Sequence, residues 1–89
     1  MPYIKQEDRP KFQPILDRVG SCMPNTAGDL NYLVTRICDK YINAKGKNYG
    51  NLNEVIGVLE CLKLEYYRRI VAPYESTKIV SNGDVYEGL

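Results

Sequence analysis

The sequence contains no histidine, and this absence removes several kinds of site. A serine or cysteine nucleophile activated by histidine is excluded, and a conventional zinc site has too few good ligands. The segment GKNYGN, residues 46–51, lacks the spacing and the Lys-Ser or Lys-Thr pair of a phosphate-binding loop. Within the expected helices no two carboxylates stand three or four residues apart, unlike the magnesium sites of helical pyrophosphatases. We therefore expect no enzyme, no metal and no cofactor.

An excess of charge of one sign is also missing, because 12 Lys and Arg oppose 11 Asp and Glu, giving a formal charge of +1. This balance gives no global attraction to nucleic acid or to an anionic membrane. The opening MPYIKQED has no apolar signal region, and no apolar run approaches the roughly 18–20 residues that span a bilayer. Tryptophan is absent, whereas eight tyrosines supply rings with a polar tip that suit a contact surface.

Cysteine is scarce, and its count is odd. Cys22, Cys38 and Cys61 cannot all pair within one chain, and their spacings do not resemble a CxxC motif. Cys38 and Cys61 occupy helical positions typical of a core, where a free cysteine behaves as a small hydrophobic residue. We expect reduced, structural cysteines and a cytoplasmic protein.

What the chain does have is one long amphipathic stretch, residues 51–71, NLNEVIGVLECLKLEYYRRIV. Asn51 and Glu54 have the spacing of a capping box, which predicts a helix that begins at Leu52. At about 100° per residue, seven apolar side chains fall in one stripe, the usual core-facing pattern. This main stripe consists of Leu52, Val55, Ile56, Leu59, Leu62, Tyr66 and Ile70.

The opposite side of the same helix carries a second, narrower row of residues, here called the seam: Gly57, Cys61, Leu64 and Arg68. A glycine inside a helix costs roughly 0.5–1 kcal/mol relative to alanine, so Gly57 is expected to allow another backbone to approach. Either the rest of the chain covers the seam, or a second copy of the protein does. The second alternative predicts a homodimer.

Two further helices precede this stretch. One is expected near residues 8–19, capped by Asp8 and interrupted at Pro14, where the helix kinks or restarts. The other is expected near 27–44, with Thr26 and Asp29 as its capping signal. We expect the third helix, 52–72, to kink or end before Pro73, followed by another short helical turn within residues 74–80. The fold predicted is all-α: a small bundle of three main helices in a single domain, residues 1–89, with an N-terminal arm and a C-terminal tail.

Polar and aromatic side chains concentrate between residues 65 and 75, EYYRRIVAPYE. Tyrosine rings and guanidinium groups together are able to hold a nucleobase and a phosphate. The ligand-binding candidates are Tyr66, Tyr67, Arg68, Arg69 and Tyr74. A structural role is the alternative, because Tyr66 belongs to the main stripe and arginines favour a helix C-terminus. Arginines that converge on a tyrosine-lined hollow favour a ligand, whereas arginines paired with Glu65 disfavour it.

Four segments, MPYIKQEDRPKF, GDLNYLVTRICDKY, NEVIGVLECLKLEYYRRIVAPYE and NGDVY, together resemble a family of small uncharacterised proteins from bacteria and their phages. The resemblance covers most of the chain and implies a compact helical protein in the cytoplasm. It supplies no activity, cofactor or catalytic residue. The function expected first is a non-enzymatic, self-associating interaction module. The alternative is a small-molecule or nucleotide-binding protein, such as a phage-encoded sponge for a signalling nucleotide.

Overall fold

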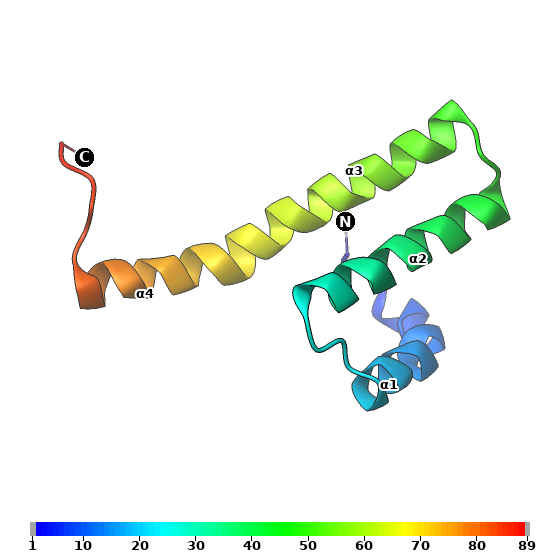
Figure 1. Ribbon diagram of the computed structural model, residues 1–89, viewed down its shortest axis with the longest axis horizontal. Helices are drawn as coiled ribbons and strands as arrows, with labels where there is room; N and C mark the ends of the chain where they lie inside the picture. The colour runs from blue at the N-terminus through cyan, green and yellow to red at the C-terminus, as the bar shows by residue number, and fades with distance from the viewer. Residues whose placement is uncertain (1, 89) are drawn as a thin grey trace. The chain divides into compact units, whose positions relative to one another are not determined.

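The computed structural model describes residues 2–88, and its regular elements are all helical, with no strand among these residues (Figure 1). The all-α class predicted from the sequence is therefore confirmed, as are a short N-terminal arm and a C-terminal tail. The elements are η1 (Gln6–Asp8), η2 (Pro10–Phe12), α1 (Gln13–Ser21), α2 (Ala27–Lys45), α3 (Tyr49–Tyr66), η3 (Tyr67–Val71) and α4 (Ala72–Asn82). The chain divides into two compact units, one that ends at Ile56 and one that begins at Gly57.

The first helix restarts next to Pro14, which is one of the two alternatives expected. The predicted cap at Asp8 is wrong, because Asp8 is the last residue of η1 and the following turn has no side-chain cap. Two 3₁₀ turns, η1 and η2, come first, and α1 then begins at Gln13 with Pro14 in its first turn. A proline is tolerated there because the missing N–H would have no partner within the helix. The N-terminal arm folds back, since the Arg9 Nε donates a hydrogen bond of 2.9 Å to the carbonyl of Ile4.

The start of α2 agrees with the predicted capping signal. Thr26 Oγ1 accepts a hydrogen bond of 3.0 Å from the backbone N–H of Asp29. In return, Asp29 Oδ2 accepts one of 3.2 Å from the N–H of Asn25, one residue before the cap. The two bonds satisfy backbone donors at the helix start that would otherwise have no protein partner.

The start of α3 differs from the sequence prediction, because the helix begins at Tyr49 rather than Leu52. The capping side chain is that of Asn48, whose Oδ1 accepts a hydrogen bond of 2.9 Å from the N–H of Asn51. Asn51 instead donates from Nδ2 to the carbonyl of Gly46 at 2.9 Å. Glu54, the expected second half of the capping box, accepts from the hydroxyl of Tyr41 at 2.7 Å. Asn48 therefore replaces Asn51 as the cap because both predicted capping groups bond the preceding helix and turn.

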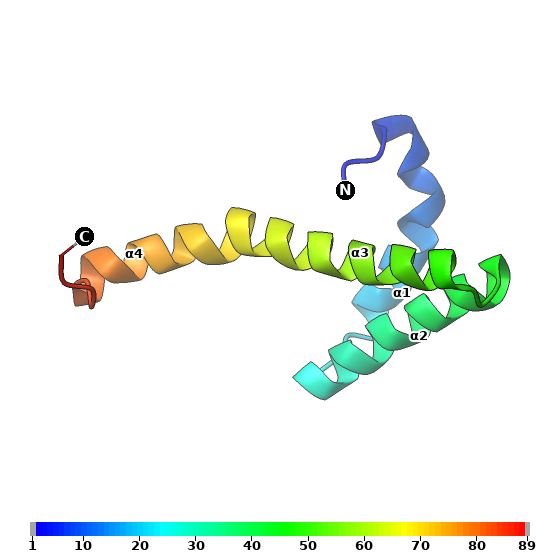
Figure 2. The same cartoon turned by 90° about the horizontal axis from the view of Figure 1, so that it is seen from above.

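The expected end at residue 72 is also wrong, since the helical path continues through η3 into α4 (Figures 1 and 2). η3 is a π-helical turn in which the N–H of Ala72 donates to the carbonyl of Tyr67, five residues earlier. A proline ring in an ordinary α-helix clashes with the carbonyl four residues before it. The wider turn before Pro73 relieves that conflict, and Pro73 then lies in the first turn of α4. The further helical turn expected within residues 74–80 is part of α4.

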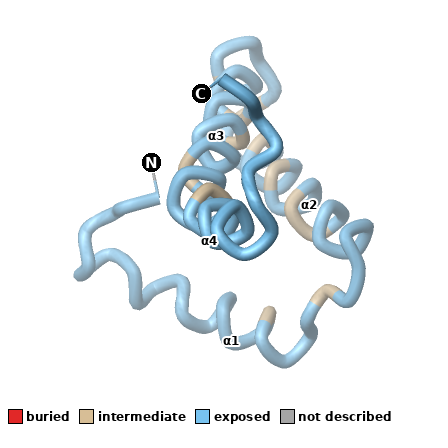
Figure 3. The backbone as a smooth tube through the Cα atoms, turned by 90° about the vertical axis from the view of Figure 1, so that its left-hand side faces the viewer, coloured by how far each residue is buried: buried red, intermediate tan, exposed pale blue. Residues whose placement is uncertain are grey.

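No described residue is fully buried, and the half-buried ones are few (Figure 3). On α2, the expected apolar face is half-buried at Leu33, Val34, Cys38 and Ile42. On the main stripe of α3, only Val55 and Leu59 are half-buried. The other five, expected as core, are exposed: Leu52, Ile56, Leu62, Tyr66 and Ile70.

Candidate functional site

The second unit contains one helical path, residues 57–82, followed by the tail. A single helix has no neighbour of its own against which to bury side chains, so its apolar residues remain exposed. Nine large ones are exposed along this path: Val58, Leu62, Leu64, Tyr66, Tyr67, Ile70, Tyr74, Ile79 and Val80. The second unit therefore presents exposed apolar side chains along the length of its helical path.

The seam is open at each of its four positions. A Cβ atom built on Gly57 meets no atom within 4 Å, and Cys61 is exposed. The side chain of Leu64 is 58% exposed, and that of Arg68 is 66% exposed. Because Gly57 has no side chain and open space beside it, another backbone has room to approach the helix closely at this position.

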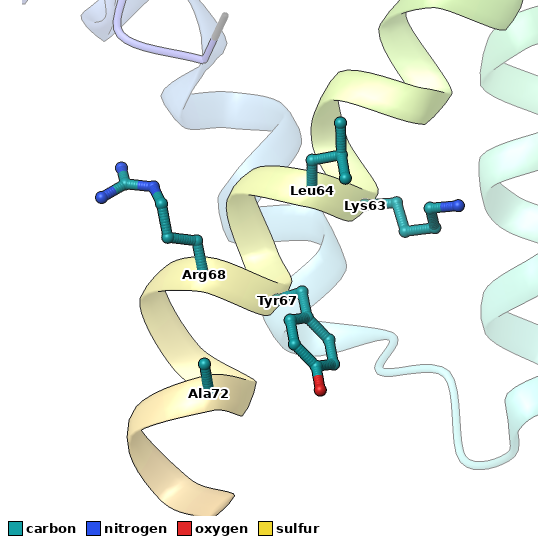
Figure 4. A pocket seen from close by; sticks show the side chains of 5 residues that line it. All are labelled: Lys63, Leu64, Tyr67, Arg68 and Ala72. Atoms are coloured by element: carbon teal, nitrogen blue, oxygen red, sulfur yellow. The ribbon is translucent and has the colours of Figure 1, made fainter. Parts of the chain in front are cut away.

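The seam extends one residue further than the sequence predicted. Leu64, Arg68 and Ala72 line one shallow depression on the helix, together with Lys63 and Tyr67 (Figure 4). In Figure 4, Leu64 and Ala72 lie between the Arg68 side chain on one side and the Lys63 and Tyr67 side chains on the other. Ala72 lies four residues after Arg68, the same spacing as between Gly57 and Cys61, so helical periodicity alone was a sufficient signal for adding it to the seam.

Local ion pairs border the seam. Arg68 Nη2 lies 2.8 Å from Glu65 Oε1 and 3.0 Å from Glu65 Oε2. Lys63 Nζ lies 3.1 Å from Glu60 Oε1, and the two side chains are 68% and 55% exposed, respectively. Such pairs on a helix surface contribute only about 0.2–0.5 kcal/mol each. The Lys63–Glu60 pair is exposed on both sides, whereas the Glu65 side chain that holds Arg68 is only 17% exposed.

The five residues proposed to hold a ligand do not gather in one hollow. Tyr67 and Arg68 line the depression, whereas Tyr66, Arg69 and Tyr74 are not among its lining residues. Tyr74 carries the Lys78 ammonium group 5.5 Å from its ring centroid. The pairing of Arg68 with Glu65 is the outcome that was expected to disfavour a ligand site.

The cysteines are all free, but only one lies as expected. Cys38 is half-buried, whereas Cys61 and Cys22 are exposed. The core position predicted for Cys61 is therefore wrong, because Cys61 lies on the seam and not on the main stripe. A thiol of this kind reports directly on whether the seam is covered.

Residues 2–88 contain neither a cluster of metal ligands nor a membrane-spanning helix. Histidine, cysteine and carboxylate side chains form no group of three or more that could hold a metal ion. In the same part of the chain, no helix is both long and apolar enough to cross a membrane.

The whole helical region has a family assignment. The chain belongs to the family described as Domain of unknown function (DUF6899), which matches residues 1–85 and so spans both units. The resemblance to a family of small uncharacterised proteins is thereby confirmed. No curated protein and no solved structure matches the chain.

Proposed function

We propose that this member of the DUF6899 family is a non-enzymatic interaction module that acts by pairing with a second copy of itself through the seam. The observation that carries the proposal is the open seam on a helix whose opposite side is also apolar. Five of the seven main-stripe residues are exposed as well, so both sides of this helix offer apolar surface to a partner. The seam differs from the main stripe in that Gly57 has no side chain, which permits the closer approach.

The residues of the seam and its border have the character of an interface. Tyrosine and arginine are enriched at the centres of protein interfaces, and Tyr67 and Arg68 border the depression. Small residues at Gly57 and Cys61 permit a close approach of helices, while Leu64 supplies apolar area. Contiguous exposed apolar surface of this kind is typical of interaction sites.

The proposal includes a setting for the protein. Three free cysteines suit the reducing cytoplasm, and we place the protein there. An origin in bacteria or their phages stays part of the proposal and rests on the resemblance alone.

Sedimentation equilibrium across a wide range of protein concentrations tests the association directly. We expect a reversible monomer–dimer equilibrium. A protein that stays monomeric at millimolar concentration would overturn the proposal.

Thiol labelling locates the association on the seam. Cys61 should react at least about tenfold more slowly in the dimer than in the diluted monomer, because exclusion of reagent by the partner limits access. Cys22 is the matched control, since it is exposed and lies in the first unit, off the seam. Dimerisation without protection of Cys61 would place the interface elsewhere.

A further inference from the structure

In the seam and along its border, two opposite charges lie at equal distances on either side of Leu64, and two small residues lie at nearly equal distances. Glu60 lies four residues before Leu64, and Arg68 lies four residues after it. Gly57 lies seven residues before, and Ala72 lies eight residues after, where the π turn has inserted one extra residue. Reversing the helix about Leu64 therefore brings acid onto base and small residue onto small residue.

We propose that two copies pair antiparallel through the seam, with Leu64 at the two-fold axis and Arg68 of each copy facing the partner's Glu60. This inference rests on the proposed function and adds the orientation, the register and the charged contacts. A two-fold contact uses the same surface on both copies, so a self-complementary seam is what it requires.

The charges favour this orientation over the parallel one. In a parallel pair, Arg68 of one copy would face Arg68 of the other copy across the interface, and like charges in an interface repel strongly. In the antiparallel pair, each guanidinium meets the carboxylate of Glu60, whose Oε1 lies 3.1 Å from its own Lys63 and whose second oxygen is left for Arg68. The pairing of Arg68 with Glu65 does not prevent this contact, because it uses Nη2 and a guanidinium has five N–H donors in all.

The sizes favour the same register. The position of a Cβ atom on Gly57 is open, and Ala72 is the smallest side chain that lines the depression. Gly57 against the partner's Ala72 would allow the two backbones to approach at both ends of the contact. Leu64 of one copy would pack against Leu64 of the other copy at the middle of the interface, with Tyr67 at its edge.

Reciprocal disulfide cross-linking tests the orientation. Gly57→Cys and Ala72→Cys are made separately in a background where Cys22, Cys38 and Cys61 are serine, and the two proteins are oxidised alone and as a mixture. Residues 57 and 72 are about 22 Å apart along a helix. In the antiparallel register two copies of the same cysteine variant would therefore hold their cysteines too far apart to form a disulfide. The antiparallel register predicts a cross-linked dimer in the mixture and little in either protein alone. Cross-linking of each protein alone would show a parallel pair and overturn the inference.

A charge exchange tests the contact in the natural cysteine background. Glu60→Arg and Arg68→Glu should each weaken association at least about tenfold, because each creates like charges across the interface. The double variant restores opposite charges and should regain most of the lost affinity. Failure of the double variant to recover, with both helical content and wild-type association intact, would overturn this register while leaving self-association standing. A monomeric wild type would instead overturn the proposed function itself.

Discussion

The turn between α2 and α3 and the seam on α3 lie close together in the sequence but are specified in different ways. Helices α2 and α3 with the turn between them are here called the hairpin. Asn48 in the turn, and Asn51 and Glu54 in the first turns of α3, each form a hydrogen bond with another part of this hairpin. In the seam, Gly57 has open space around it, and Leu64 is mostly exposed. The turn is fixed by bonds within the chain, whereas the seam is open and is the surface proposed to bind a second copy.

The strongest test of this contrast is Gly57→Leu. In a dimer the new side chain separates two backbones, and overpacking of about 1–3 kcal/mol corresponds to roughly a tenfold to hundredfold weaker association. The monomer should remain helical, since no atom lies within 4 Å of the added Cβ and leucine favours a helix more than glycine does. Sedimentation equilibrium and circular dichroism measure the two effects.

Gly20→Leu is the matched control for that experiment. Gly20 also lies in a helix and also has no atom within 4 Å of an added Cβ, but it belongs to α1 and not to the seam. Association should be unchanged in this variant. If both substitutions weakened association equally, the effect would not belong to the seam.

In the turn, Gly46→Ala should lower the stability of the folded chain. Gly46 has φ 111° and ψ 140°, a backbone conformation that residues with a Cβ atom rarely adopt. We expect a loss of about 1–3 kcal/mol in the free energy of unfolding, measured by urea denaturation. Gly50→Ala is the control, because Gly50 lies in α3 and its added Cβ would make an ordinary contact at 3.5 Å with Asn48 Oδ1. It should be neutral or slightly stabilising, and an equal loss at both positions would remove the backbone explanation.

Asn48→Ala tests the position of the helix cap. Loss of the hydrogen bond to the N–H of Asn51 should destabilise the chain by about 1 kcal/mol. Asn53→Ala, on the exposed side of α3, should be close to neutral. A cap at Asn51, as the sequence indicated, would leave Asn48→Ala without effect in thermal denaturation.

The sequence predicted features that depend on residues near one another in the chain. The cap at Thr26 follows from local backbone chemistry and was predicted correctly, and the restart next to Pro14 was one of the two alternatives expected. The start of α3 was missed because Asn51 and Glu54 have the spacing of a capping box. In the structure the Glu54 carboxylate instead accepts a hydrogen bond from the hydroxyl of Tyr41, thirteen residues earlier. Only the fold of the hairpin decides between these two partners.

The candidate site was predicted in part for a related reason. The four seam residues share a face because they fit a regular helix, and the structure leaves that face open. Ala72 was missed although it lies four residues after Arg68, a spacing that keeps two residues on one face of a helix. Burial of Cys61 was also predicted wrongly, because helical periodicity groups residues into faces without saying which face a partner covers.

The smallest effect expected concerns the hydrogen bond from the Tyr41 hydroxyl to Glu54, which closes the hairpin. This bond raises the pKa of Tyr41 above its ordinary value, with partial desolvation and the charge of Glu54 acting in the same direction. The folded pKa therefore lies above the unfolded one. The contribution to stability is complete below the unfolded pKa, near pH 10, and is lost as the pH rises through the folded value. In an ultraviolet titration of phenolate, Tyr41→Phe should remove a component that titrates above the ordinary pKa of tyrosine. Tyr49→Phe, which alters a tyrosine that is 82% exposed, should leave that component in place. A late component that survives Tyr41→Phe would show that the hairpin is not closed by this bond.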